Sequence, residues 1–251
     1  MKIKVISLNM YEGILLDKAV DFLKLENPDI LFLQEVYGQN APESDNQFRT
    51  LEILQNTLQL SHSYFIPGLR HRREEGKFLI GNAIFSRYPI IRSTAVFFNA
   101  PYNDDFVVDP KYNHMYPHTL QHVVIDTPDG EVNAFNIHGT WDLDGDNYSE
   151  QRKQMSQAII RAVESKPHVI LAGDTNAKPT NQAMRRVEQH LTSVFGDSLK
   201  TTFNMSRKNN PGYASAAVDM MFVGHDITIV ERKCPNVDVS DHLPLVVTLD
   251  V

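Results

Sequence analysis

Polar side chains that can bind metal ions or move protons follow several apolar stretches of this sequence. They are Asn9 after "VISL", Glu35 after "ILFLQ", His138 after "AFNI", Asp174 and Asn176 in "VILAGDTN", Asp219 in "AVD", and Asp241 and His242 in "SDHLP". Short apolar or β-branched runs are typical of buried strands. Because strand ends can hold side chains rigidly around one cleft, we expect these residues to converge on a common site.

The chemistry that suits this set is metal-assisted hydrolysis of a phosphoester. Carboxylates and an amide form a hard, oxygen-rich site that favours Mg²⁺ or Mn²⁺ over zinc. The sequence contains no HExxH and no paired CxxC, so a zinc site has little support. Phosphodiester cleavage requires charge neutralisation, an activated water and a stabilised leaving oxygen, and metal, His and Asn groups can supply all of these.

Each residue also has a structural explanation when it is taken alone. Asn9 can cap a turn, and Asp174 can open a turn or cap a helix. Glu35 can be a solvated strand end, Asp219 an edge-strand charge, and His138 a hydrogen-bonded, half-buried imidazole. Isolated matches are weak, and it is their recurrence at strand ends that favours a site.

The elements that must position these residues alternate between strands and helices. "IKVISL" and "DILFLQ" are predicted strands, and apolar residues at helical spacing predict a helix over 15–25 that ends before Asn27-Pro28. Further helices are predicted over 47–58, over 149–164 and after Pro179. Further strands are predicted at "HSYFI", "FLIGNAIF", "IIRSTAVFF", "TLQHVVID", "EVNAFNIHG", "HVILAGD", "AVDMMFV", "DITIVER" and "LPLVVTL". With no linker or repeat, we expect one domain over residues 1–251, with two packed sheets and helices on the outer faces.

Composition excludes some classes of protein and partner. The formal charge of −7 over 251 residues disfavours sequence-blind nucleic-acid binding, although a locally basic cleft remains compatible with it. Cys234 is the only cysteine, which excludes an internal disulfide. The sequence has neither a secretory signal nor a membrane span, so we expect a cytoplasmic protein with no obligate protein partner.

Taken in order, the same residues resemble the motifs of the endonuclease/exonuclease/phosphatase superfamily, which has the DNase I-like fold. The matching stretches are "SLNMYEG", "LFLQEV", "GNAIFSRYPI", "FNIHG", "LAGDTN", "VDMMFV" and "SDHLP", and they cover nearly the whole chain. The resemblance implies a four-layer α/β/β/α sandwich with the site at one end of two mainly antiparallel, mixed sheets.

The resemblance also implies a metal centre. Glu35, with Asn9 and Asp241, would bind Mg²⁺ or Mn²⁺. Two positions depart from the family pattern, because Thr175 stands where an aromatic or apolar residue is common, and Met220 where many relatives have an aromatic. Neither would bind metal, so the departures affect local packing rather than chemistry.

The catalytic roles follow from the same resemblance. Asp174 would orient and deprotonate the attacking water, and Asn176 would hold a phosphate oxygen. Asp219 would brace His242, which contacts the phosphate or acts as base. His138 would lie on the leaving-group side or bind phosphate, and the sequence leaves open which histidine is acid and which is base.

Members of the superfamily cleave DNA, RNA tails, phosphoinositides, sphingomyelin and protein–nucleotide links. We predict a metal-dependent hydrolase that acts on a nucleic-acid or related phosphodiester. The alternative is a phospholipid or small-molecule phosphoesterase, of the sphingomyelinase or inositol-phosphatase kind. An inactive phosphate-binding module is disfavoured because Glu35, Asp174 and His242 are all present. A serine triad is excluded, since Ser240, Asp241 and His242 are adjacent on extended chain and GxSxG is absent.

Several other segments have alternative interpretations. The basic cluster 70–77 is either a solvated hairpin loop or a segment whose arginines bind phosphates beside the cleft. Segment 102–119 is either a lid or an extension of a sheet. Trp141 can stack on a substrate or pack locally, and Glu12 is either an acid near the metal or a surface turn residue. The alternating Asp142, Asp144 and Asp146 do not complete a calcium loop.

Overall fold

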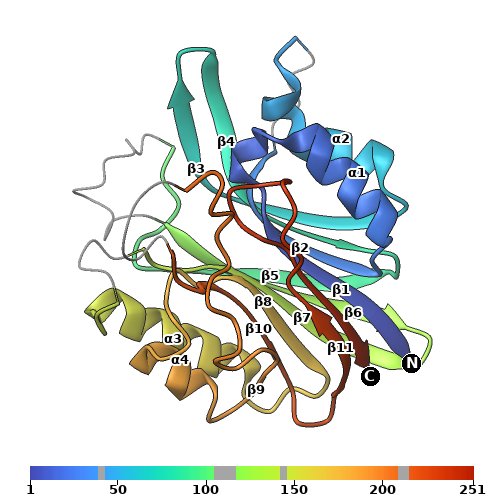
Figure 1. Ribbon diagram of the computed structural model, residues 1–251, viewed down its shortest axis with the longest axis vertical. Helices are drawn as coiled ribbons and strands as arrows, with labels where there is room; N and C mark the ends of the chain where they lie inside the picture. Colours follow the sequence, from blue (N-terminus) through green and yellow to red (C-terminus); the bar gives the residue numbers. More distant parts are fainter. Residues whose placement is uncertain (39–42, 105–116, 142–145, 209–214) are drawn as a thin grey trace.

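The computed structural model describes residues 1–38, 43–104, 117–141, 146–208 and 215–251 (Figure 1). Its strands form two sheets of 6 strands each. The first sheet has the order β11 (Thr228–Lys233), β12 (Leu245–Asp250), β1 (Lys2–Asn9), β2 (Ile30–Tyr37), β4 (Gly76–Ser86) and β3 (His62–Arg73). The second has the order β5 (Ile90–Phe98), β6 (His118–Thr127), β7 (Gly130–His138), β8 (Val169–Asp174), β10 (Asp219–Val223) and β9 (Thr192–Ser193).

Three apolar clusters hold the layers together. The first lies between the sheets and includes Val5, Phe32, Val123 and Ile170. The second joins the first sheet to α1 (Leu16–Glu26) and α2 (Thr50–Thr57), and the third joins the second sheet to α3 (Glu150–Val163) and α4 (Gln182–Val187). Figure 1 shows the two helix pairs on opposite outer faces. The predicted α/β/β/α sandwich is therefore confirmed.

The chain opens with the predicted strand–helix–strand unit. Strand β1 pairs with β2 in parallel, with Asn9 opposite Gln34, and α1 connects them. Helix α1 buries Leu16, Ala19, Val20 and Leu23, which share one helical face. It ends at Asn27, whose φ of 47° is left-handed, immediately before Pro28. This connection places the ends of β1 and β2 side by side.

A layer of buried amide side chains joins the two sheets beneath those strand ends. Asn136 donates to Leu33 O at 2.9 Å and to Gln121 Oε1 at 2.9 Å, and it accepts from Gln34 Nε2 at 2.7 Å. All three amide side chains are fully buried. Because buried amides are costly unless they are paired, this network fixes how the sheets align.

Some sequence interpretations change. Most of the basic cluster 70–77 is strand rather than loop, because β3 runs to Arg73, which pairs with Gly76 of β4. In the β3–β4 hairpin, ion pairs from Arg70 to Asp104 and from Arg73 to Glu12 neutralise part of the positive charge of this cluster. The predicted helix over 47–58 divides into a 3-10 turn, Asn46–Arg49, and α2.

Other predictions fall wholly or partly outside the described residues. Most of segment 102–119 lies outside the described residues, and so do Asp142 and Asp144. Asp146 is described, and its Oδ1 accepts from Lys178 N at 3.1 Å. In the described ranges, no helix is long and apolar enough to cross a membrane.

We expect Asn136→Ala to lower the free energy of unfolding by about 3 kcal/mol, because several buried partners lose their hydrogen bonds together. Urea denaturation measures this loss. Asn56→Ala, on the exposed face of α2, is the control and should change stability little. A loss at Asn136 no larger than at Asn56 would contradict the role of the amide layer.

Candidate active site

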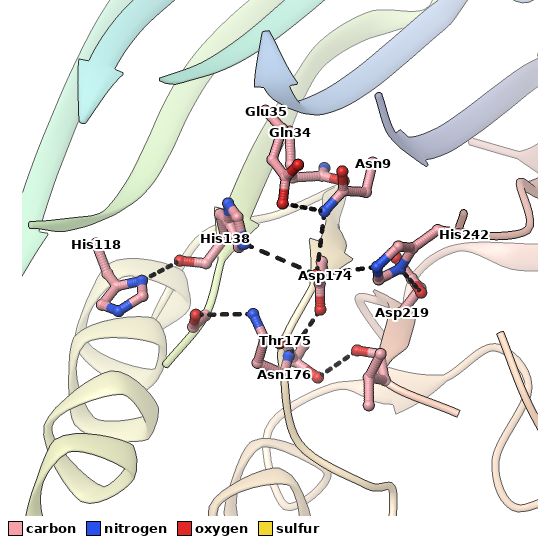
Figure 2. A network of polar contacts seen from close by, with 12 residues as sticks. Asn9, Gln34, Glu35, His118, His138, Asp174, Thr175, Asn176, Asp219 and His242 are labelled. Carbon is pink, nitrogen blue, oxygen red and sulfur yellow. Dashed lines mark hydrogen bonds and ion pairs between the residues drawn. The ribbon is translucent and has the colours of Figure 1, made fainter. Parts of the chain in front are cut away.

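The strand pairing gathers the predicted site residues at one end of the two sheets. In the first sheet, Asn9 ends β1 beside the end of β2, which carries Glu35. In the second sheet, Asp174 ends β8 and pairs with His138 of β7 on one side and with Asp219 of β10 on the other. Figure 2 shows these side chains pointing toward one another from both sheets.

The carboxylate of Asp174 lies at the centre of this group and is 2% exposed. Its Oδ2 accepts from Asn9 Nδ2 at 3.2 Å and lies 3.7 Å from His138 Nε2 and 3.9 Å from His242 Nε2. Its Oδ1 accepts from the backbone N–H of Asn176 at 2.9 Å. Asp174 therefore links the Asn9 side of the site to both imidazoles (Figure 2).

Burial and the nearby Asp219 carboxylate raise the pKa of Asp174, although His242 and His138 oppose this effect. Burial alone would lower the pKa of His242, but Asp219 and Asp174 outweigh it and raise that pKa to about 10. Asp219 Oδ2 lies 2.8 Å from His242 Nδ1, which orients the ring. At neutral pH His242 is therefore an imidazolium that points Nε2 toward Asp174.

A β-bulge in β2 directs the side chain of Glu35 toward the site. The pairing of β2 with β4 shifts register between Leu33 and Val36, and Glu35 has a φ of 56°. Such bulges redirect a side chain at the cost of local strain. Asn9 Nδ2 donates to Glu35 Oε1 at 3.1 Å, so a single amide group contacts both Glu35 and Asp174.

Asn9 is itself held from two directions. Its Oδ1 accepts from the backbone N–H of Tyr11 at 3.0 Å, which directs Nδ2 toward the carboxylates. The Ser240 hydroxyl donates to the Asn9 backbone O at 2.6 Å and accepts from His242 N at 3.2 Å. Ser240, to which sequence reasoning gave no chemistry, thus ties the "SDHLP" segment to the end of β1.

The loop after β8 is also fixed by a residue that departs from the family pattern. The buried Thr175 hydroxyl donates to Val218 O at 2.7 Å and so joins this loop to the start of β10. Asn176 has a φ of 51° and donates from Nδ2 to Gly139 O at 3.1 Å. Any Cβ at position 139 would lie 2.2 Å from Thr175 O, so the close approach requires glycine there. The other departure, Met220, packs in the core beneath α3 and α4.

Asp241 forms its ion pair with a lysine rather than with the Asp174 cluster. It is 6% exposed, and its Oδ2 contacts Lys208 Nζ at 2.7 Å. Sequence reasoning missed Lys208, because it lies in an irregular segment with no strand pattern. It also missed His118, whose Nδ1 lies 3.2 Å from His138 O. Burial, together with His138, lowers the pKa of His118 to about 3, so this ring is a neutral support.

The donor set fits a hard divalent cation. Glu35 Oε1 and Asp174 Oδ2 lie 3.1 and 3.2 Å from one nitrogen of Asn9, so two carboxylates face the same space. Asp174, Asp219 and His242 also lie close enough to share an ion. However, Asp219 already bonds His242 Nδ1, and a protonated imidazole cannot bind metal. The oxygen-rich side near Glu35 is therefore the better place for a divalent cation.

Comparison with known proteins agrees with this geometry. The sequence profile of the Endonuclease/Exonuclease/phosphatase family matches residues 6–242. The chain belongs to this family. Members are hydrolases that act on phosphoester bonds. No curated protein sequence matches the chain.

Solved structures share the fold of this family member at low sequence identity. An endonuclease/exonuclease/phosphatase from Beutenbergia cavernae is 20% identical, with a TM-score of 0.72 over 99% of this chain and 71% of its own. A mannosyl-6-phosphatase from Bacteroides thetaiotaomicron is 17% identical, with a TM-score of 0.67 over 99% of this chain and 100% of its own. The human nocturnin catalytic domain with bound sulfate is 17% identical, with a TM-score of 0.70 over 99% and 94%. At these identities the likeness establishes the fold alone.

We expect the imidazole of His242 to remain protonated through pH 8 in metal-free protein, because Asp219 and Asp174 raise its pKa to about 10. Histidine ring resonances followed by NMR against pH measure this directly, and His242→Gln assigns the signal. In Asp219→Asn the His242 resonance should titrate at lower pH, since one neighbouring negative charge is removed. Titration of the wild-type ring near pH 6.5, or no change in Asp219→Asn, would contradict this charge assignment.

Proposed function

We propose that this protein is a Mg²⁺- or Mn²⁺-dependent phosphoester hydrolase. The observation that carries the proposal is the buried Asp174 carboxylate, which contacts Asn9 on one side and faces the His242 imidazolium on the other. A base and a fixed positive charge around one small space are what attack of water on phosphorus requires.

The metal would be held by Glu35, with Asp174 beside it. When bound, a divalent ion would polarise the phosphoryl group and neutralise part of its charge. Asn9 would act chiefly by orienting the Glu35 and Asp174 carboxylates, because its Nδ2 faces both and its Oδ1 is taken by Tyr11 N. Asp241 would contribute negative charge from its position next to Lys208.

Asp174 is the proposed general base. Its raised pKa makes it a stronger proton acceptor than an ordinary aspartate, and Asn176 N holds its Oδ1 so that Oδ2 faces the site. The attacking water would lose its proton to Oδ2. Asn176 would also help to hold a phosphate oxygen from the loop after β8.

The histidines would stabilise the charge that develops on the phosphoryl oxygens. His242, braced by Asp219, would donate a hydrogen bond from Nε2 to a non-bridging oxygen. His138, from the neighbouring strand β7, would lie on the leaving-group side, where His118 Nδ1 contacts its backbone O. In this proposal His242 is the fixed cation, and His138 is the group that assists departure of the leaving oxygen.

The proposed substrate is a nucleic-acid or related phosphodiester. A small phosphoester is a second candidate, and a specific observation favours it. Arg70 and Arg73 of the basic cluster are already paired with Asp104 and Glu12, so they offer less positive charge to a polynucleotide. The name of the mannosyl-6-phosphatase neighbour is consistent with this second class.

We expect Mg²⁺ or Mn²⁺ to support hydrolysis of at least one phosphoester, and Asp174→Asn to reduce kcat by about 10²-fold or more because the base is removed. The panel should include bis-(p-nitrophenyl) phosphate, p-nitrophenyl phosphate, single-stranded DNA, RNA, sphingomyelin and inositol phosphates. The exposed Asp126→Asn on β6 is the matched control and should retain full activity. If no ester is cleaved with either ion, the proposed function is wrong.

His242→Ala should lower kcat by about 10²-fold or more with a smaller change in KM, because the lost hydrogen bond strengthens as charge develops. Steady-state kinetics on the best substrate of the panel test this. An unchanged kcat would remove His242 from the proposed mechanism.

A further inference from the structure

A lysine that no sequence motif indicated lies at the edge of the carboxylate group. The Lys208 ammonium contacts Asp241 Oδ2 at 2.7 Å and lies 4.9 Å from the centre of the Phe203 ring. Phe203 in turn packs edge-on against His242, with ring centroids 4.7 Å apart. With its side chain 30% exposed, Lys208 is partly enclosed by the site.

The backbone that carries Lys208 is attached to the "SDHLP" segment. Asn204 N donates to Asp241 O at 2.8 Å, and Lys208 N donates to Asn204 O at 3.1 Å. Asn204 Nδ2 also donates to Ser240 O at 2.9 Å. Lys208 is therefore fixed relative to Asp241 and differs from a solvated surface lysine.

A second ion pair strengthens this attachment. The guanidinium of Arg207 contacts Asp238 through both Nε and Nη2, and Lys18 reaches the same carboxylate at 2.6 Å. The turn that ends at Lys208 is thus held by side-chain contacts as well as by backbone hydrogen bonds.

The ammonium shares the electrostatic environment of the proposed metal. Burial opposes its charge, but Asp241, Glu35 and Asp174 outweigh burial and raise the pKa of Lys208. Counted by formal charge, the carboxylates of Glu35, Asp174, Asp219 and Asp241 contribute −4 and the cations His242 and Lys208 contribute +2, which leaves −2. A single divalent cation would cancel the remainder.

We propose that Lys208 is the fixed second cation of the active centre. Its ammonium forms an ion pair with Asp241, so the remaining negative charge of the site matches one divalent ion. The positive charge of Lys208 also repels that ion and weakens its binding. The inference rests on the proposed function only in assuming a metal site near Glu35 and Asp174. It makes this a one-metal centre in which an ammonium stands where a second ion would otherwise bind.

The test is calorimetric titration of chelator-treated protein with Mn²⁺, without substrate. We expect Lys208→Met to bind Mn²⁺ about tenfold more tightly than wild type or better, because a nearby positive charge is removed and Asp241 is released. Lys208→Arg should keep the wild-type affinity. Lys233→Met is the matched control, since Lys233 pairs with Glu26 at 2.9 Å outside the site, and it should also bind as wild type does.

An affinity in Lys208→Met that is unchanged or weaker would overturn the proposal. A residue that only supported the fold would weaken metal binding when removed, so the direction of the change separates the two roles. Thermal melting checks that the variants fold, and Lys208→Gln replaces the Met variant if that one does not. Absence of Mn²⁺ binding by wild type would instead defeat the proposed function, so the two failures are distinguishable.

Discussion

Burial of the Asp174 carboxylate is the constraint on which the site depends. An ionised carboxylate removed from water is strongly unfavourable unless hydrogen-bond donors or positive charges surround it. At 2% exposure, Asp174 meets this requirement through Asn9, the backbone N–H of Asn176, and the two imidazoles. The same contacts that stabilise the buried charge also assemble the chemical groups around it.

The donors come from different sheets, so the site requires those sheets to be held in register. Asn9 comes from β1 of the first sheet, whereas Asp174 and His138 come from β8 and β7 of the second. Directly below, Gln34 and Asn136 bond across the interface, and each lies within two residues of a site residue on its own strand. The amide layer thus fixes the relative positions of the two sheets next to the site, and with them the positions of the site residues.

Sequence patterns predicted the layers, the strand order along the chain and the positions where strands end in polar residues. These predictions succeeded because buried strands and amphipathic helices have characteristic spacings of apolar residues, which can be recognised in the sequence. Glu35 illustrates the limit of such patterns. Its motif is visible in the sequence, but the bulge and positive φ that turn it into the site arise from pairing with β4.

Other features depend on contacts between distant segments and left no local pattern. Lys208 is next to Asp241 because contacts such as the bond from Asn204 N to Asp241 O hold its turn against the "SDHLP" segment. The charged stretch after Arg70 resembled a loop, yet strand pairing with β4 continues through it. The sequence indicated no role for Ser240 once a serine triad was excluded, and its bond to Asn9 depends on the pairing that places β1 and β12 side by side.

In the proposed active site, one buried carboxylate separates an oxygen-rich metal position from a fixed imidazolium. Anomalous diffraction from a crystal of the protein containing Mn²⁺ would locate the ion. We expect a single peak within bonding distance of the Glu35 carboxylate, on the side of Asp174 away from His242. A peak bound between Asp219 and His242, or no peak near Glu35, would contradict this arrangement.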